Sequence, residues 1–259
     1  MKRLPYLFAL SVGLMAVTGF NAIAALQPTT AFDPASQLLL ANRLRNRGMR
    51  FRVRPSRYRI GAFSRGSCPE GAVPVVPVVE EAESQKTAPA YLTASAHPTF
   101  FINIPEMSEA SGFIYVDDPN STERSPQLYK AAFDLGDKAG IVGIQMPSDA
   151  PPLQEGSSYR WRVVIRCGSE TDQTGTVVFS GGEIERVADI EGTTEERLEY
   201  YLQEGVWQEA ALIIAEDRYY NPQSAGADED WTLLMQESGI AQFAEVPIID
   251  ITESRLSDN

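Results

Sequence analysis

The chain has 259 residues, of which 43% are hydrophobic, and a formal net charge of −13 at pH 7. This length suffices for one large domain, or for a domain with a helical appendage. One histidine and two distant cysteines disfavour a zinc site, which needs three or four clustered ligands.

Residues 1–24 have the features of a secretory signal peptide. Lys2 and Arg3 supply a positive start, residues 4–20 are mostly apolar, and Ala22-Ile23-Ala24 fits the small-x-small cleavage rule. The apolar run is marginal against the ~20 residues of a membrane span, so an uncleaved anchor is the alternative. We expect cleavage after Ala24 and export to the periplasm or extracellular space, without stable membrane insertion afterwards.

Residues 25–66 are interpreted as a basic arm. Residues 1–66 hold eleven of the 22 Lys and Arg residues but one of the 35 acids, so residues 67–259 hold 11 basic and 34 acidic side chains. The arginines between Arg43 and Arg65 alternate with aromatic residues, as nucleic-acid binding would require, but export argues against that partner. We expect a solvated arm or edge strand that meets the acidic body or an anionic surface, such as lipid headgroups or polysaccharide.

Residues 67–97 contain Cys68 and a segment rich in proline and glutamate. The composition of Val73 to Ala90 predicts an extended linker that does not pack. Cys68 has one possible partner, Cys167. Because export implies an oxidising compartment, we predict a Cys68–Cys167 disulfide, with two buried thiols as the alternative.

Residues 98–190 show the short, turn-separated strands of an antiparallel sandwich. The predicted strands are Thr99–Ile104, Gly112–Val116, Leu128–Leu135, Gly140–Met146, Ser158–Cys167 and Thr176–Val187, the last with Gly181-Gly182 as a bulge or hairpin turn. In the fifth strand, Tyr159, Trp161, Val163 and Ile165 alternate with Arg160, Arg162, Val164 and Arg166. Its Leu153-x-x-Gly156-x-x-Tyr159 lead resembles the tyrosine corner of immunoglobulin-like sandwiches.

Residues 191–246 change to helical patterns. Thr193 and Glu196 form a capping box before a helix that ends at Gly205. A second helix is predicted over Val206–Tyr219, and a third is predicted to begin at an Asp228 cap and end at Gly239. The predicted fold is therefore mainly β with a C-terminal α part: an immunoglobulin-like antiparallel β-sandwich with a small helical hairpin packed on it, followed by a tail at 247–259.

The order of these landmarks resembles a cyanobacterial family of exported proteins known as a domain of unknown function, number 928 in its series. The resemblance covers roughly Arg54 to Pro247. It rests on Gly61–Cys68, Pro98–Pro105, Gly140-Ile141-Val142, Leu153–Cys167, Gly205-Val206-Trp207 with Ala210, and Trp231–Leu234 with Gly239-Ile240. It implies export and a sandwich with helices, and it implies no activity. Gln208-Glu209 departs from the aromatic and Asp more usual in the family, which removes the case for a catalytic acid there.

The candidate residues for chemistry are few. His97 lies where a strand begins, and as the only histidine it would have to be the base of any Ser-His or Cys-His catalytic pair. However, Gly66-Ser67-Cys68 does not have the strand-turn-helix context of a nucleophile elbow. Cys68 would also be no nucleophile if it forms a disulfide. We therefore expect no enzyme, no catalytic residues and no cofactor.

Two acidic loops could offer oxygen ligands to calcium, although neither has the spacing of an EF-hand. We interpret them as solvated turn acids and a helix cap, and they are Asp117, Asp118, Asn120 and Glu123 in one loop and Asp228, Glu229 and Asp230 in the other. Trp161, Trp207 and Trp231 are expected in the core rather than on a carbohydrate platform.

The sequence thus predicts an exported, non-enzymatic protein–protein interaction module of the cell envelope. The alternative is a calcium-dependent or carbohydrate-binding module, and a hydrolase of unrecognised type comes third.

Overall fold

The computed structural model describes residues 54–59, 62–66, 68–78, 87–107, 110–121, 126–133, 135, 138–169 and 172–256. The predicted signal peptide, most of the basic arm and Glu123 lie outside these residues.

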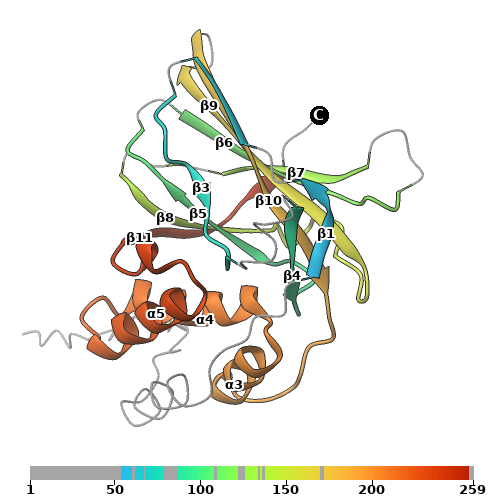
Figure 1. Cartoon of the computed structure of the whole chain (residues 1–259), viewed down its shortest axis with the longest axis vertical. Coiled ribbons are helices and arrows are strands. Elements are labelled where there is room, and N and C mark those ends of the chain that lie inside the picture. Colours follow the sequence, from blue (N-terminus) through green and yellow to red (C-terminus); the bar gives the residue numbers. More distant parts are fainter. Residues whose placement is uncertain are drawn as a thin grey trace, which may run out of the picture.

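The described chain forms three layers, an eight-stranded sheet, a four-stranded sheet and a layer of helices (Figure 1). The first sheet has the order β1 (Arg54–Arg59), β4 (Thr87–Thr93), β10 (Asp172–Arg186), β9 (Ser158–Ser169), β6 (Ala110–Asp117), β7 (Gln127–Phe133) and β12 (Arg255–Leu256), and β2 (Ala62–Gly66) also pairs with β10. The second has the order β11 (Ile248–Glu253), β8 (Gly140–Gln145), β5 (Thr99–Ile104) and β3 (Val73–Pro74). The helices are α3 (Thr194–Glu204), α4 (Trp207–Tyr220), α5 (Ala225–Glu237) and the short 3-10 helix η1 (Ala241–Phe243).

Strand β5 lies in the middle layer and is buried on both faces. Pro98 and Pro105 bound it, because proline interrupts a ladder of backbone hydrogen bonds. Phe100 points into the core between the two sheets and lies 4.7 Å from Trp161, measured between ring centroids. Phe101 points to the other side, toward Trp207 and Trp231 of the helices. The helices therefore cover the outer face of the four-stranded sheet.

The helix signals are largely confirmed. Thr193 caps α3 in a complete capping box with Glu196, and Gly205 ends the helix in the left-handed conformation. The start of α5 differs from its prediction, because the helix begins at Ala225 and its N-cap is Ser224, whose hydroxyl accepts from the Ala227 N–H. All three predicted helices are present, and together they are larger than the small hairpin named in the predicted fold. No described helix is long and apolar enough to cross a membrane.

Two expectations about the strands need correction. The sandwich is not wholly antiparallel, because β4 runs parallel to β10 and β11 runs parallel to β8. The described part of the predicted linker is packed, since Val75 is buried and its N–H donates to the Phe101 carbonyl. The Tyr91 hydroxyl donates to the carbonyl of Pro77, 2.9 Å away. Composition alone missed this packing, because strand partners from distant parts of the chain supply it.

The predicted disulfide and the glycine bulge are both confirmed. Cys68 is bonded to Cys167, which ties the segment before β3 to the end of β9. The β9–β10 register shifts between Ser180 and Gly182, which marks a bulge rather than a hairpin turn. At the bulge, a Cβ on Gly181 would lie 1.8 Å from Cζ2 of Trp161, so the indole ring occupies the space of a side chain.

Candidate functional site

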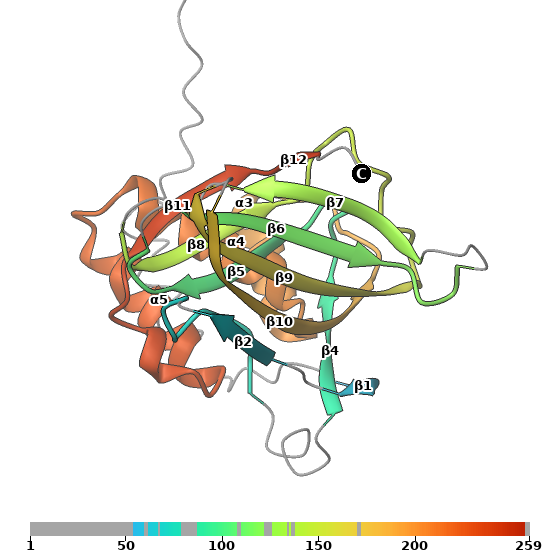
Figure 2. The same ribbon diagram turned by 90° about the horizontal axis from the view of Figure 1, so that it is seen from above.

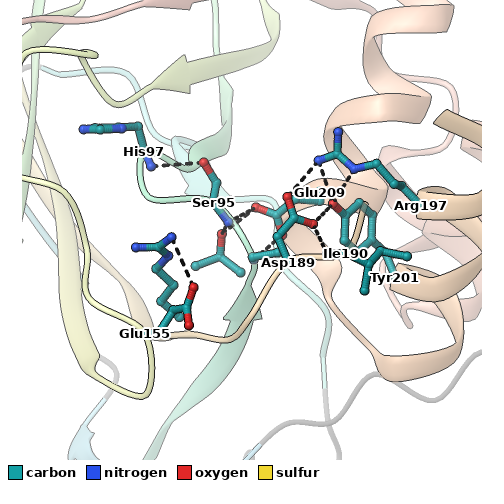
Figure 3. A network of polar contacts seen from close by, with 11 residues as sticks. Ser95, His97, Glu155, Asp189, Ile190, Arg197, Tyr201 and Glu209 are labelled. Carbon is teal, nitrogen blue, oxygen red and sulfur yellow. Dashed lines mark hydrogen bonds and ion pairs between the residues drawn. The ribbon is translucent and has the colours of Figure 1, made fainter. Parts of the chain in front are cut away.

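A buried carboxylate joins the helical layer to the sheets (Figure 3). Glu209 on α4 is 7% exposed, and its Oε1 accepts hydrogen bonds from the Thr93 hydroxyl at 2.5 Å and the Ser95 N–H at 3.1 Å. Its Oε2 accepts from the Ala94 N–H at 2.9 Å. Burial raises the pKa of Glu209, while these three donors oppose the shift. All three donors come from the end of β4 and the loop after it, so this carboxylate positions α4 on the sandwich.

A second polar group, formed by Asp189 and by Arg197 and Tyr201 of α3, lies beside Glu209. The Tyr201 hydroxyl donates to Asp189 Oδ1 at 2.6 Å, and the Arg197 guanidinium donates to the same hydroxyl and to Asp189 Oδ2. Burial and the bond to Asp189 raise the pKa of Tyr201 to about 12. The phenol is therefore neutral at physiological pH and serves as a structural donor.

A pocket of about 210 Å³ lies between α3 and α4. Arg197, Tyr201 and Glu209 contribute to its wall together with Leu212 and Glu216. Burial raises the pKa of Glu216. The polar groups of these residues already form hydrogen bonds within the protein: Arg197 and Tyr201 with each other and with Asp189, and Glu209 with the end of β4 and the loop after it. Most polar groups in the pocket wall therefore already have partners.

A different surface is formed by the outer face of the eight-stranded sheet, where β7, β6, β9 and β10 lie side by side in front of the second sheet (Figure 2). The register places Tyr115 of β6 between Arg162 of β9 and Lys130 of β7. Phe113, one row away on the same face, is partly exposed. We call Phe113, Tyr115, Lys130, Arg162 and Arg166 the cationic-aromatic face.

Cations cover both rings of this face. The Arg162 guanidinium carbon lies 4.1 Å from the Tyr115 ring centroid, and Arg162 Nε lies 3.5 Å from a carboxylate oxygen of Asp117. Lys130 Nζ and the Arg166 guanidinium carbon lie 4.9 Å and 5.0 Å from the Phe113 ring centroid. Such contacts hold cations over aromatic faces and contribute roughly 0.5–1 kcal/mol each at exposed sites.

Among the described residues, Lys130 and Arg166 have no carboxylate partner, in contrast to four other arginines. Arg162, Arg186, Arg197 and Arg218 each form an ion pair with an acidic residue. Within the described ranges, no acidic side chain pairs with Lys130 or Arg166, whose contacts are to the Phe113 ring. On a chain whose net charge is −13, these two cations are therefore available to an external anion.

The residues considered for catalysis do not converge. The His97 Nε2 atom lies 3.0 Å from the Ala150 carbonyl oxygen, and the His97 N–H donates to Ser95 Oγ. Cys68 forms a disulfide with Cys167, so it has no thiol that could act as a nucleophile. The Ala150 carbonyl and the Ser95 hydroxyl thus place His97 in a structural turn.

The acidic residues of the two loops do not form one site either, because they contact neighbouring groups of the protein. Asp117 pairs with Arg162, and Asp118 Oδ1 accepts from the Asn120 N–H. On α5, Asp228 pairs with Arg218, while Asp230 is 4% exposed. No group of three or more His, Cys, Asp or Glu side chains suited to a metal occurs in the part of the chain that the structure describes.

The three tryptophans are buried, as predicted, with 0–1% of each side chain exposed. Sequence reasoning named Glu209 and Asp230 but did not predict their burial, and Asp230 is not the solvated acid that was expected. A signal existed for Glu209, since it is an acid among apolar residues over Trp207–Ala215, where a helix would otherwise be buried all round. The five-residue cationic-aromatic face was not predicted either, although the alternating arginines of β9 were noted.

The fold and these sites define a mainly β, two-sheet protein with a C-terminal helical layer. The model of the family Domain of Unknown Function (DUF928) matches residues 60–248, and the chain belongs to this family. No curated protein and no solved structure matches the chain.

Proposed function

We propose that the chain is an exported, non-enzymatic interaction module of the cell envelope, and that its cationic-aromatic face binds a protein partner. The main observation behind this proposal is that the outer faces of the two sheets differ. The helices cover the outer face of the four-stranded sheet, whereas the opposite face presents partly exposed Phe113 and Tyr115 under cations. Aromatic and arginine side chains are enriched where proteins bind each other.

The finer fold assignment is part of this proposal. We assign the sandwich to the immunoglobulin-like type, in which two sheets pack on one core and the chain crosses between them more than once. The pairing of β5 with β8 in one sheet, and of β6 with β7 and β9 in the other, supports it. The Tyr159 hydroxyl, which accepts from the Gln154 N–H at 3.0 Å, supports it as a tyrosine corner.

Export rests on the signal-like residues 1–24. Expression in a bacterial host with a separable periplasm should yield a mature protein that begins at Ala25, as read by N-terminal sequencing. Retention of Met1 on a cytoplasmic product would contradict the export part of the proposal.

The interaction part is tested by affinity capture from envelope extract with matched variants. Phe113→Ala removes the central ring of the face, and Tyr220→Ala removes an aromatic side chain that is 62% exposed on α4. We expect a captured protein to be lost with Phe113→Ala and retained with Tyr220→Ala. Equal capture by both variants and the wild type would place binding elsewhere.

A further inference from the structure

We propose that the partner of the cationic-aromatic face is an acidic protein segment that presents carboxylates to Arg166 and Lys130 on either side of Phe113. This inference rests on the proposed function and names the chemistry of the partner. Its starting point is that these two cations lack carboxylate partners among the described residues, while four arginines of the same chain have them.

The positions of the cations suit an extended chain. Arg166 lies on β9 and Lys130 on β7, with Phe113 of β6 between them. Lys130 Nζ and the Arg166 guanidinium carbon lie 4.9 Å and 5.0 Å from the Phe113 ring centroid, so the two charged groups are at most about 10 Å apart. Glutamates at alternate positions of an extended peptide can reach cations at such a separation.

The aromatic rings of this face are covered by cations, which favours a ligand with carboxylates over a sugar. A sugar ring would need an open aromatic face for stacking, but Arg162 lies over Tyr115, and Lys130 and Arg166 lie over Phe113. A cation that lies over a ring keeps N–H donors that can bind a carboxylate, and a guanidinium can do so with two parallel hydrogen bonds. The rings therefore orient the cations rather than contact the ligand first.

Charge also limits the choice of partner. Residues 1–66 are strongly basic, so the chain's own N-terminal part would be repelled by this face. Residues 67–259 are strongly acidic, so an acidic partner would be repelled by the rest of the body and directed to the face. Binding should therefore be specific to one surface and weaken with added salt.

The test uses the mature protein and a labelled peptide of alternating Glu and Thr, with a Gln/Thr peptide as control, followed by fluorescence anisotropy. We expect binding of the Glu peptide only, weakened by salt. Lys130→Gln and Arg166→Gln should each weaken it by roughly two- to fivefold, the range of an exposed ion pair. Lys138→Gln, a change of an exposed lysine in the β7–β8 loop, should leave it unchanged.

Equal binding of the Gln peptide, or wild-type affinity in both Lys130→Gln and Arg166→Gln, would overturn the inference. Binding of an oligogalacturonate but not of the Glu peptide would also overturn it, and so would self-association of the protein with no peptide binding. If capture from envelope extract still depends on Phe113 in those cases, the proposed function stands and only the acidic chemistry of the partner fails.

Discussion

The Thr93 hydroxyl at the end of β4 donates a 2.5 Å hydrogen bond to Glu209 on α4, across 116 residues of sequence. The same carboxylate binds two backbone N–H groups of the loop after β4. This contact is a buried polar link between the helical layer and the sheets, and it lies beside the apolar cluster that contains Trp207.

We expect Glu209→Ala to lower the free energy of unfolding by about 2–4 kcal/mol, because it leaves buried donors without an acceptor. Urea unfolding measures the change. Glu216→Ala is the control, since Glu216 lies two turns further along α4 and accepts no hydrogen bond from described residues, and it should change stability by less than about 1 kcal/mol. Similar losses for the two variants would show that the three hydrogen bonds add little.

Removal of the disulfide should weaken the fold strongly. Cys68 and Cys167 are separated by 99 residues, and closing a loop of this size lowers the entropy of the unfolded chain by the equivalent of about 4–5 kcal/mol in the chain-entropy model. We expect the Cys68→Ser/Cys167→Ser double variant to unfold at a much lower urea concentration than the oxidised protein. Equal midpoints would contradict a stabilising role for the bond.

Stability should depend on the ionisation of Asp230. Burial, together with the nearby carboxylates of Asp217 and Glu229, raises the pKa of Asp230 to about 7 from an ordinary value of 3.8. The folded state therefore holds this proton more tightly than the unfolded chain. The stabilisation is complete below about pH 4 and is lost as the pH rises through 7.

Asp230→Asn should consequently stabilise the protein relative to the wild type at pH 8.5, and the difference should shrink at pH 5. Thermal unfolding at the two pH values measures it. Asp228→Asn, which removes an exposed partner of Arg218, serves as the control and should not show this pH-dependent gain. A gain for Asp230→Asn that is the same at both pH values would rule out the titration of Asp230 as its cause.

Gly181 should not tolerate a side chain while Trp161 is present. A Cβ at this position would overlap the indole, so Gly181→Ala should cost about 1–3 kcal/mol or more through overpacking. In a Trp161→Leu background the same change should cost less, which a double-mutant cycle measures. Additive losses would mean that the glycine is required for another reason.

The strands of the sandwich were predictable because their signals are local. Pro98 and Pro105 mark the ends of β5, and its apolar residues on both faces agree with its place in the middle layer. The capping box at Thr193 is equally local. In contrast, β3 and β4 lie in a segment with the composition of a linker, and their partners β5 and β10 lie far along the chain.

The candidate site was predictable only in part, for a related reason. The alternation of Arg160, Arg162 and Arg166 placed them together on one face of a strand. That Phe113 and Tyr115 would lie under these cations depends on the register between β6 and β9, which the sequence pattern does not determine. Glu209 was set aside as a catalytic acid because Gln208-Glu209 departs from the family pattern. That β4 and the loop after it would supply three hydrogen-bond donors to this carboxylate could not be read from its neighbours in the sequence.

The central claim is that the cationic-aromatic face contacts a protein partner in the envelope. A photo-crosslinking amino acid at Ser111, an exposed position opposite Arg166 on this face, tests it most directly. Gln236, exposed on α5 in the helical layer, is the matched position. We predict that irradiation of intact cells joins the position-111 variant, and not the position-236 variant, to a specific protein. Crosslinks from position 236 alone would contradict the account.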